Sequence, residues 1–496
     1  MKSNANPQKS LIDIVLSPYW VRRWGLALLF FICLGIVYLS SKGVWLIGFL
    51  IAGACMGAPV LLATMVNTKV GVYMMVSIAF IMSMFLRLIQ GVPIGLLMDF
   101  TILLMTVGEL LKDIEKREYT FFKTPLSWVV YIWMGWHFLE LANPEAASRV
   151  AWFYVARPAV GYIMIYFVTY RFLNSRTEIK KLLSLIIFLS FFSGAWGVAQ
   201  FVFGYFPFEM NYIIQNDAVH LVFIQGRWRS FGTMGSPAHF GVIMAYMVVF
   251  CILLIGFKKT FWGRFYYIVV IVTCFMGLVY SGARSGIAVI PLAGATVVGL
   301  SKNMKLYVTS LFAGIGLFFV IIMPTDNYHI KRIQSTFKSD EDESFQVREK
   351  NKEMIIPWIM AHPMGGGLGS TGVWGQRFSP GTFLANFPPD SGYVRVAVEM
   401  GWIGYLLYLL LWGAVLIKTL LMYLKVKDEE LRWIAIGIFG ALCPLVVVET
   451  AQDIVGKLPS NMLFWIWVAM LLRALEIGTI PNRESIYDEP AEDSDK

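Results

Sequence analysis

The chain has 496 residues, of which 57% are hydrophobic and 15% are charged, and its mean hydropathy is +0.65. A soluble domain of this length does not need so many apolar residues, so the composition predicts a protein that is embedded in a lipid membrane. The formal charge of +9 is carried by basic residues in many short loops and not by one stripe, which argues against a nucleic-acid partner.

Several apolar stretches are long enough, or nearly so, to cross a membrane as helices. They include residues 25–39, 44–65, 182–203, 242–255 and 306–323. The expected fold class is therefore all-α, a polytopic integral membrane protein with about twelve to fourteen transmembrane helices. Basic residues precede the first stretch and no clear cleavage site follows it, so we interpret it as a retained span and not as a signal peptide.

The loops between spans alternate in charge along the chain. One set is basic and contains residues 112–123, 171–181, 258–264, 302–305 and 425–432. The positive-inside rule places this set, together with both termini, in the cytoplasm. The complementary set then lies outside and contains residues 140–158, 204–236, 281–285, 324–389 and 449–460. All five cysteines fall within predicted spans as packing residues, and no metal site or cofactor is expected.

The extracytoplasmic loop at residues 324–389 is the longest, with about sixty-five residues, which is too long for a passive connection. Residues 348–361 have the spacing of an amphipathic helix that either lies on the membrane surface or caps a cavity, and Pro357 predicts a kink or a break in it. The expected division of the chain is an N-terminal transmembrane region (1–203), a second transmembrane region with the long loop (204–476) and a disordered cytoplasmic tail (477–496).

Residues 367–372, GLGSTG, match the GxGxxG pattern of dinucleotide-binding proteins. That fingerprint requires a strand before it and a helix after it within a βαβ unit. Here Pro363 and two glycines precede the match, and Trp374 and Gly375 follow it. We therefore interpret the tract as a turn, or as a flexible loop that lets the backbone approach a ligand.

Basic residues mark the end of the second outer loop, in the segment QGRWRSFGTMGSPAHFG at residues 225–241. Arg227 and Arg229 lie there beside Trp228 and several glycines. A guanidinium group binds two phosphate oxygens at once and stays charged, so both arginines are candidate ligands of a pyrophosphate, with lipid headgroups as the alternative. His239 is either an acid or base or a hydrogen-bonded packing residue.

A charged residue also stands between two apolar spans in the motif YSGARSG, residues 280–286. A charge in that place is costly unless it faces a cavity or a partner, so Arg284 is a candidate functional residue, with a structural ion pair as the alternative. Asp99 in an early span and Glu449 near an outer end are acids that a transporter would use for proton coupling.

The motif FPPDSGYVRVAVEMG, which begins at Phe387, marks the return of the long loop to the membrane. Asp390 and Ser391 are candidate caps of the following helix, and Asp390 is alternatively a base that deprotonates a sugar hydroxyl. Arg395 and Glu399 are one helical turn apart and can pair with each other.

Taken in chain order, these motifs resemble the O-antigen ligase and Wzy-type polymerase superfamily, bacterial membrane glycosyltransferases of the GT-C kind. The resemblance covers residues 196–467. Its landmarks are Arg229-x-x-Gly232 with Pro237, Ser281-x-x-Arg284, Arg348 followed by Trp358, His362-Pro363, Gly365 to Gly369, and Glu399-x-Gly401-x-x-Gly404. The resemblance implies a donor oligosaccharide linked to undecaprenyl pyrophosphate, held by Arg229 and Arg284 at the periplasmic surface, and metal-independent transfer to an acceptor hydroxyl.

Ligases of this superfamily usually carry a His-Asn pair where this chain has Asp390-Ser391, so we expect an exopolysaccharide or O-antigen polymerase. The expected catalytic residues are Asp390 and Arg284, and the expected substrate-binding residues are Arg227, Arg229, Arg284, Arg348, His239 and Glu399. The alternatives are a ligase that transfers a finished glycan to lipid or protein, and a transporter or flippase of lipid-linked sugars. The expected location is the bacterial inner membrane, among lipids, with a flippase and a chain-length co-polymerase as further partners.

Overall fold

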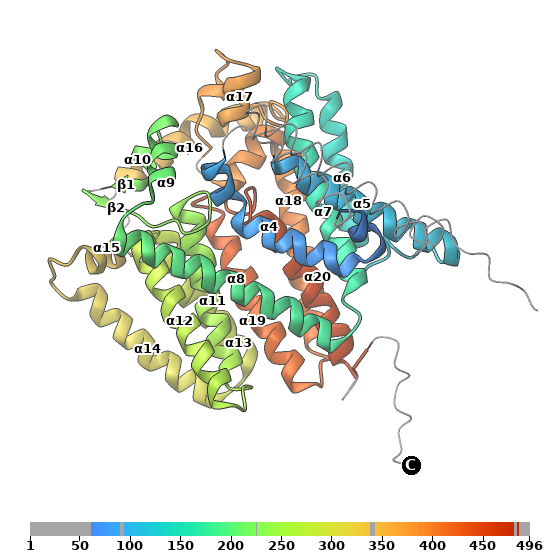
Figure 1. Cartoon of the computed structure of the whole chain (residues 1–496). Coiled ribbons are helices and arrows are strands. Elements are labelled where there is room, and N and C mark those ends of the chain that lie inside the picture. The colour runs from blue at the N-terminus through green and yellow to red at the C-terminus, as the bar shows by residue number, and fades with distance from the viewer. Residues whose placement is uncertain are drawn as a thin grey trace, which may run out of the picture.

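The computed structural model describes residues 61–89, 94–224, 226–337, 343–389, 391–480 and 484–485. Within these residues the chain is almost entirely helical, and the two named strands, β1 (Phe223–Ile224) and β2 (Arg227–Trp228), form one short antiparallel hairpin. The expected all-α fold class is thereby confirmed (Figure 1). The predicted span at residues 25–39 and most of the one at 44–65 lie outside the described residues.

Ten of the described helices are long and apolar enough to cross a membrane. They are α4 (Thr68–Leu88), α7 (Arg149–Phe172), α8 (Arg176–Phe203), α11 (Pro237–Ile255), α12 (Phe261–Ser281), α13 (Arg284–Ser301), α14 (Met304–Ile322), α18 (Gly392–Tyr423), α19 (Glu429–Val448) and α20 (Ser460–Gly478). The other helices are α5 (Ile94–Lys116), α6 (Ser127–Leu139), η1 (Glu140–Ala142), α9 (Pro207–Gln215), α10 (Val219–Val222), α15 (Tyr328–Thr336), α16 (Glu343–Ala361), α17 (Gly372–Phe378) and η2 (Leu384–Asn386).

Side-chain caps fix where several of these spans begin. The Ser236 hydroxyl accepts a hydrogen bond from the backbone N–H of His239 at 3.4 Å, and α11 starts at the next residue. The Asp428 carboxylate accepts one from the N–H of Leu431 at 2.9 Å and begins α19 in the same way. Because lipid offers no hydrogen bonds, caps of this kind satisfy backbone groups that the first turn of a helix leaves unpaired.

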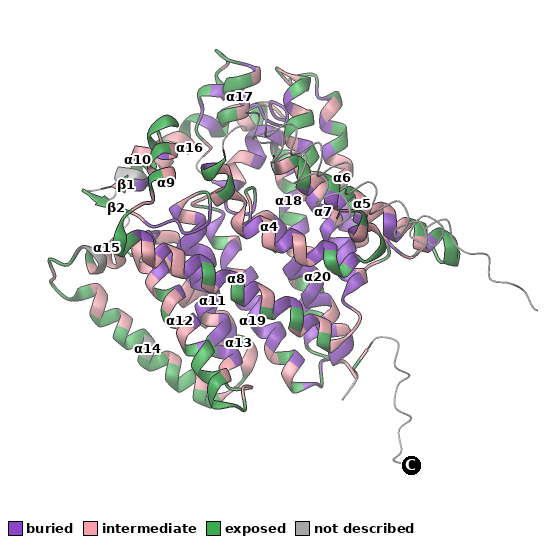
Figure 2. Cartoon of the chain, in the orientation of Figure 1, coloured by how far each residue is buried: buried purple, intermediate pink, exposed green. Residues whose placement is uncertain are grey.

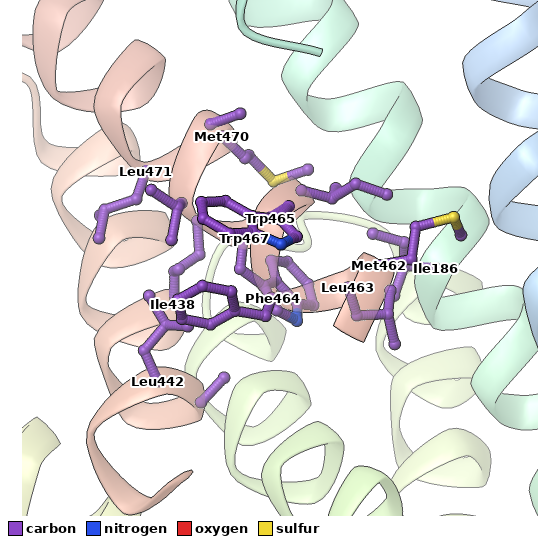
Figure 3. Close-up of a cluster of buried hydrophobic side chains, with 14 of the residues drawn as sticks. Ile186, Ile438, Leu442, Met462, Leu463, Phe464, Trp465, Trp467, Met470 and Leu471 are labelled. Carbon is purple, nitrogen blue, oxygen red and sulfur yellow. The ribbon is translucent and has the colours of Figure 1, made fainter. Parts of the chain in front are cut away.

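The core of the bundle lies around α20. Figure 3 shows Phe464 and Trp467 of α20 packed with Leu442 of α19 and Ile186 of α8, and all four side chains are buried. In contrast, α14 exposes apolar side chains over most of its surface at the edge of the molecule (Figure 2). A helix that is apolar and exposed is expected where a membrane protein meets lipid tails, so α14 belongs to the periphery and α20 to the centre.

The outer loops predicted from charge contact one another. The Asn143 side-chain amide donates to the carbonyl of Met364 at 2.9 Å, which joins the loop at residues 140–158 to the long loop. Backbone N–H of Gly392, where the long loop ends, donates to the carbonyl of Glu449 at 3.1 Å in the loop between α19 and α20. These loops therefore form one surface at one end of the bundle.

The basic loops gather at the other end of the same spans, since α8, α11, α12, α13, α19 and α20 each connect one set of loops to the other. Arg176 pairs with Asp428, and Lys180 pairs with Glu430 at 2.6 Å, so the start of α8 is tied to the start of α19. Basic and complementary loops thus alternate between two ends of the bundle, as their charges predicted.

The long loop is built from short helices and not from irregular chain. Its α16 begins before the predicted amphipathic segment and continues through Pro357, so of the predicted kink or break the break is absent. The inward face of α16 consists of Ile355, Trp358 and Ile359, whereas Met354, which was expected on the same face, is 51% exposed. The GxGxxG match lies in the turns between α16 and α17 and follows no described strand, which agrees with its interpretation as a turn.

The C-terminal boundary differs from the expected one. The last span, α20, runs to Gly478, so the first two residues of the predicted tail belong to a helix. The N–H of Arg176 also donates to the carbonyl of Glu484 at 2.9 Å, which holds that part of the predicted disordered tail against the start of α8. Most other residues of the tail lie outside the described ones.

Candidate functional site

Two arginines bind the backbone of the turn between α12 and α13. We call this turn, residues 281–284, the arginine turn. The Nε of Arg229 donates to the carbonyl of Ser281 at 2.7 Å, and the Nε of Arg332 donates to the carbonyl of Gly282 at 3.0 Å. Arg284 is the first residue of α13 and is half-buried. Two guanidinium groups, one from the segment before α11 and one from α15, therefore bind carbonyls of the turn that contains Arg284, which concentrates positive charge at one end of the bundle.

The turn can form because Gly282 adopts a left-handed conformation, with φ of 57°, that ends α12. The side chain of Ser281 is buried and accepts a hydrogen bond from the N–H of Ala283 at 3.1 Å. Gly241 of α11 packs closely against Ser281, since a Cβ at position 241 would come within 2.6 Å of the Ser281 hydroxyl. The shape of the arginine turn thus depends on residues that sequence spacing alone does not connect.

Arg227 takes a different position from Arg229. It lies in β2, is exposed, and lines a hollow of about 330 Å³ together with Arg229, Tyr205 and Trp228. The hydroxyl of Tyr205 donates to the carbonyl of Arg229 at 2.7 Å and so connects the wall of this hollow to the arginine turn. The structure therefore brings both predicted arginines of this motif to one place, with Arg227 on the outer rim and Arg229 at the base.

A second cavity, of about 410 Å³, lies among α6, α7, α17, α18, α20 and the loop between α19 and α20; we call it the central cavity. Its aromatic lining consists of Trp133, Tyr162, Trp374, Tyr408, Phe464 and Trp465. Its charged lining consists of Arg395, Glu399, Asp453 and Lys457. A mostly apolar cavity with a few convergent charged groups is the usual composition of a ligand site.

The charged groups of the central cavity are joined in a chain of contacts. Arg395 binds Asp453 through two nitrogens, at 2.9 and 3.2 Å, and its third nitrogen lies 3.7 Å from Glu399. Glu399 also accepts a hydrogen bond from the hydroxyl of Thr371 at 2.6 Å. Burial raises the pKa of the Asp453 carboxyl, but the charges of Arg395 and Lys457 outweigh burial and hold it below its ordinary value.

The expected pairing of Arg395 with Glu399 is present, yet Arg395 binds Asp453 more closely, which the sequence did not indicate. Glu399 lies between this arginine and Thr371 of the long loop. It therefore positions the loop against α18 in addition to carrying charge. Its place in the cavity wall makes it available to a ligand that enters there.

The arginine turn and the central cavity are connected through the loop between α19 and α20. The hydroxyl of Ser285, the residue after Arg284, donates to the side-chain oxygen of Gln452 at 2.7 Å. The next residue along that loop is Asp453, which binds Arg395. One short loop thus contacts both parts of the candidate site.

Glu449 holds this loop in shape. Its side chain is fully buried, and one carboxylate oxygen accepts from the N–H groups of Ile454, at 3.0 Å, and Val455. Burial raises the pKa of the Glu449 carboxyl, and the charge of Asp453 raises it further. A Cβ on Gly392 would lie 1.5 Å from the other carboxylate oxygen, so only glycine fits at the start of α18 beside it.

His239 is buried, and its Nδ1 lies 2.6 Å from the hydroxyl of Ser236, the N-cap of α11. It also interacts electrostatically with Asp453 and Lys457, which places it beside the loop between α19 and α20. Arg348 is half-buried on α16, and the described chain does not bring it into the lining of the central cavity or of the hollow beside Arg227.

Asp390, the expected base, lies outside the described residues. The residue before it, Pro389, lines the central cavity. The residue after it, Ser391, caps α18 by accepting from the N–H of Val394 at 3.3 Å, and it donates to the carbonyl of Glu449 at 2.9 Å. The predicted cap of this helix is therefore present at Ser391.

Sequence reasoning did not identify four residues of the site: Arg332, Thr371, Asp453 and Lys457. Each lies in a loop that was assigned to the outer set, and this assignment is the feature of the sequence that could have pointed to them. Their roles depend on contacts across long chain separations, such as the 50 residues between Arg332 and Gly282.

Residues 269–409 match the family model described as O-antigen ligase. The matched segment contains the arginine turn, Arg332, Thr371 and the Arg395–Glu399 pair, whereas Arg229 and Asp453 lie outside it. No curated protein matches the chain closely enough to count as a relative. The predicted resemblance to the O-antigen ligase and Wzy-type polymerase superfamily is confirmed by this match, which covers residues 269–409 and supports the class of membrane glycan ligases and polymerases.

Proposed function

We propose that this protein is a membrane glycosyltransferase that polymerises oligosaccharide repeats carried on undecaprenyl pyrophosphate. The observation that carries the proposal is the arginine turn beside the central cavity, joined to it through Ser285 and Gln452. A transferase of this kind needs a fixed positive site for the pyrophosphate and an adjoining cavity with carboxylates for the sugars. The O-antigen ligase match over residues 269–409 supports the same class of reaction.

The donor binds with its pyrophosphate at the arginine turn. Arg229, Arg284 and Arg332 supply guanidinium groups, which fit phosphate oxygens with paired hydrogen bonds. They stabilise the negative charge that grows on the pyrophosphate as it leaves, which is the role that a metal ion has in other transferases. Arg227 lies on the rim of the adjoining hollow and extends this site outward.

The transfer itself is a displacement at the anomeric carbon of the first donor sugar. An acceptor hydroxyl forms the new C–O bond, the bond from that carbon to the pyrophosphate oxygen breaks, and the lipid pyrophosphate leaves with the electron pair. The hydroxyl proton passes to a carboxylate, for which we propose Asp390 because its neighbour Pro389 lines the central cavity. Glu399 and Arg395 position the long loop and Asp453 around the acceptor.

The polymerase is favoured over a ligase by the Asp390-Ser391 pair, since the resembling ligases usually carry His-Asn there. The transporter alternative depended on unpaired acids within the membrane. Asp99 pairs with Arg157 at 3.1 Å, so this acid has a structural partner. The proposal includes a periplasmic site in the bacterial inner membrane, a flippase that supplies the donor and a co-polymerase that sets chain length.

The test is transfer in vitro with purified protein in lipid nanodiscs, EDTA and a pyrophosphate-linked oligosaccharide. Arg229→Ala, Arg284→Ala and Asp390→Asn are compared with wild type. Arg264→Ala is the matched control, because the Nε of Arg264 also donates to a backbone carbonyl, that of Lys258 at 2.8 Å, but at the other end of the bundle. Longer lipid-linked chains from wild type and the control, and a loss of about a hundredfold or more in the three variants, are expected.

Transfer of the intact glycan to a second acceptor without chain growth would identify a ligase instead. If wild type leaves the oligosaccharide unchanged and moves it across a proteoliposome bilayer, the protein is a transporter and the proposal is wrong. Equal losses in Arg264→Ala and Arg229→Ala would show that the arginine turn has no special part in donor binding.

A further inference from the structure

A separate hollow of about 400 Å³ lies on the long loop, and we call it the loop pocket. Its side chains include Trp358 and His362 of α16 and its end, Phe383 before η2, and Glu145 of the loop between η1 and α7. No residue that lines the loop pocket also lines the central cavity. It is therefore a distinct site within the described surface.

The aromatic wall of the loop pocket is fixed in place. The rings of Trp358 and His362 are stacked, with centroids 4.0 Å apart and planes 11° from parallel. The Nδ1 of His362 lies 2.6 Å from the carbonyl of Trp358, and because a carbonyl only accepts, this nitrogen must carry a proton and donate. The Nε2 is directed to the Glu145 carboxylate at 3.4 Å, so an imidazole nitrogen and a carboxylate stand side by side at the pocket.

The polar floor of the pocket contains a hydroxyl that lacks a partner in the described chain. Ser370 is 5% exposed, lines the pocket, and its Oγ makes no hydrogen bond to any described group. A buried hydroxyl without a partner is costly, and native proteins normally satisfy such groups with a ligand or with water. The neighbouring residue, Thr371, binds Glu399 in the central cavity. Of these two consecutive residues, Ser370 therefore lines the loop pocket and Thr371 lines the central cavity.

The lining of the loop pocket determines which ligands suit it. Its described lining residues include no lysine or arginine, and Glu145 supplies a carboxylate, so a phosphate or another anion is not favoured there. Phe383 is 49% exposed and offers an apolar ring face next to hydroxyl, imidazole and carboxylate groups. A pyranose ring has the matching pattern, with an apolar C–H face and hydroxyls around its edge.

We propose that the loop pocket binds one sugar residue of a neutral or amino-substituted glycan. This inference rests on the proposed function in one respect, namely that the glycan is the growing or accepting chain. Ser370 lines the loop pocket and the next residue, Thr371, lines the central cavity, so we place successive sugars of one chain in the two sites. The pocket therefore holds the chain between rounds of addition and leaves the chemistry to the central cavity.

Binding is measured by isothermal titration with purified protein in nanodiscs, using three probes without a lipid carrier. The probes are a neutral hexose tetrasaccharide, an N-acetylhexosamine tetrasaccharide and inorganic pyrophosphate. Ser370→Ala, Glu145→Gln and Phe383→Ala are compared with wild type, and Phe203→Ala serves as a control because Phe203 is 81% exposed at the end of α8 and far from the pocket in sequence. Each pocket variant is expected to bind the tetrasaccharide about fivefold or more weakly.

Pyrophosphate is expected to bind wild type and the pocket variants equally, and not to compete with the tetrasaccharide. Ser370→Ala should fold as well as wild type, since it removes a hydroxyl that has no described partner. The proposal is overturned if neither tetrasaccharide binds wild type, if pyrophosphate displaces it, or if the pocket variants bind as wild type does. These outcomes are independent of transfer activity, so a failed transfer assay with intact saccharide binding would remove only the proposed function.

Discussion

Single buried polar residues hold together the loops of this protein that were predicted to lie outside. Asn143 is one of them, since its amide donates to Glu140 at 2.9 Å and to the carbonyls of Met364 and Gly365 at 2.9 and 3.2 Å. One amide thus joins a short helix to the long loop. The second carboxylate oxygen of Glu140 has no hydrogen-bond partner within the described chain although the residue is buried, which makes its charged form costly.

Glu140 is therefore expected to make stability depend on pH. Burial raises the pKa of its carboxyl from 4.5 to about 7, against the Asn143 hydrogen bond, and the charge of Glu399 raises it further. The folded state binds the proton more tightly than the unfolded state, so the contribution of Glu140 to stability is fully present below about pH 4.5 and is lost as the pH rises through about 7. Thermal unfolding between pH 4.5 and 8 should show this fall in wild type and a flatter curve in Glu140→Gln. Parallel curves would contradict the assignment.

A second prediction at this scale concerns Arg332, for which the adjacent residue, Lys331, provides a control. Arg332→Ala removes the guanidinium that binds the carbonyl of Gly282, whereas Lys331→Ala removes an exposed lysine that pairs with Asp326 at 2.9 Å. Loss of a charge-assisted contact of about 2 kcal/mol corresponds to about thirtyfold in kcat/KM for the lipid-linked donor. The lysine variant should keep its activity, and an equal decrease in both would indicate a general disturbance of α15.

Residue types at the ends of spans were sufficient to select Arg229 and Arg284 as candidates, because a charge beside an apolar run is unusual. The same reasoning could not find Asp453 or Arg332. Asp453 is held by Arg395, which lies 58 residues earlier in the chain, and no local pattern connects the two. Contacts of this kind depend on how the spans pack, which charge and hydropathy do not specify.

At the scale of elements, the break in α18 explains how the long loop is attached. Gly401 has φ of 69° and ψ of −178°, so the helix is interrupted there. The carbonyl of Val398 accepts from the N–H of Gly366 at 2.9 Å, and the N–H of Ile403 donates to the carbonyl of Pro363 at 3.4 Å. Two groups of the sequence landmarks, around Pro363 and around Gly401, are therefore joined backbone to backbone.

Gly401→Ala is expected to disrupt this junction. A Cβ at this position would lie 2.0 Å from the carbonyl oxygen of Pro363, and the backbone conformation is one that only glycine adopts readily. We expect a loss of stability of more than about 2 kcal/mol together with loss of activity. Gly413→Ala in the same helix is the control, because a Cβ there meets no atom within 4 Å. The unfolding temperatures of the two variants are compared. Similar temperatures would argue against a role of Gly401 in attaching the long loop to α18.

The helix α16 shows how a helix continues through a proline. Pro357 lacks the N–H that the helix needs, which predicted a kink or a break. The helix continues because Ile355, Trp358 and Ile359, on both sides of the proline, pack against Val398 of α18 and its neighbours. Tertiary burial of an apolar face outweighs one missing hydrogen bond, and a single-sequence pattern cannot weigh these two effects.

At the scale of the whole molecule, the two sets of loops lie at opposite ends of the spans, and all functional proposals depend on which end faces outward. Charge alternation and hydropathy sufficed to predict the all-α fold class and the division into two sets, because lipid imposes both constraints on any chain that crosses it. The number of spans was harder to obtain. Helices such as α5 and α6 pack within the bundle, and the residues before 61 lie outside the described part.

The orientation can be tested with single cysteines at the two ends. Val373 of α17 is 76% exposed among the outer loops, and Lys259 is exposed in the basic loop between α11 and α12. In intact spheroplasts, a membrane-impermeant maleimide should label Val373→Cys directly and Lys259→Cys only after permeabilisation, because the positive-inside rule places the basic loops in the cytoplasm. Wild type is the background control, since its native cysteines include the buried Cys251 and Cys274. The reverse pattern would place the arginine turn in the cytoplasm, where a donor presented at the periplasmic surface does not reach it, and the polymerase proposal would then fail together with the glycan path past the loop pocket.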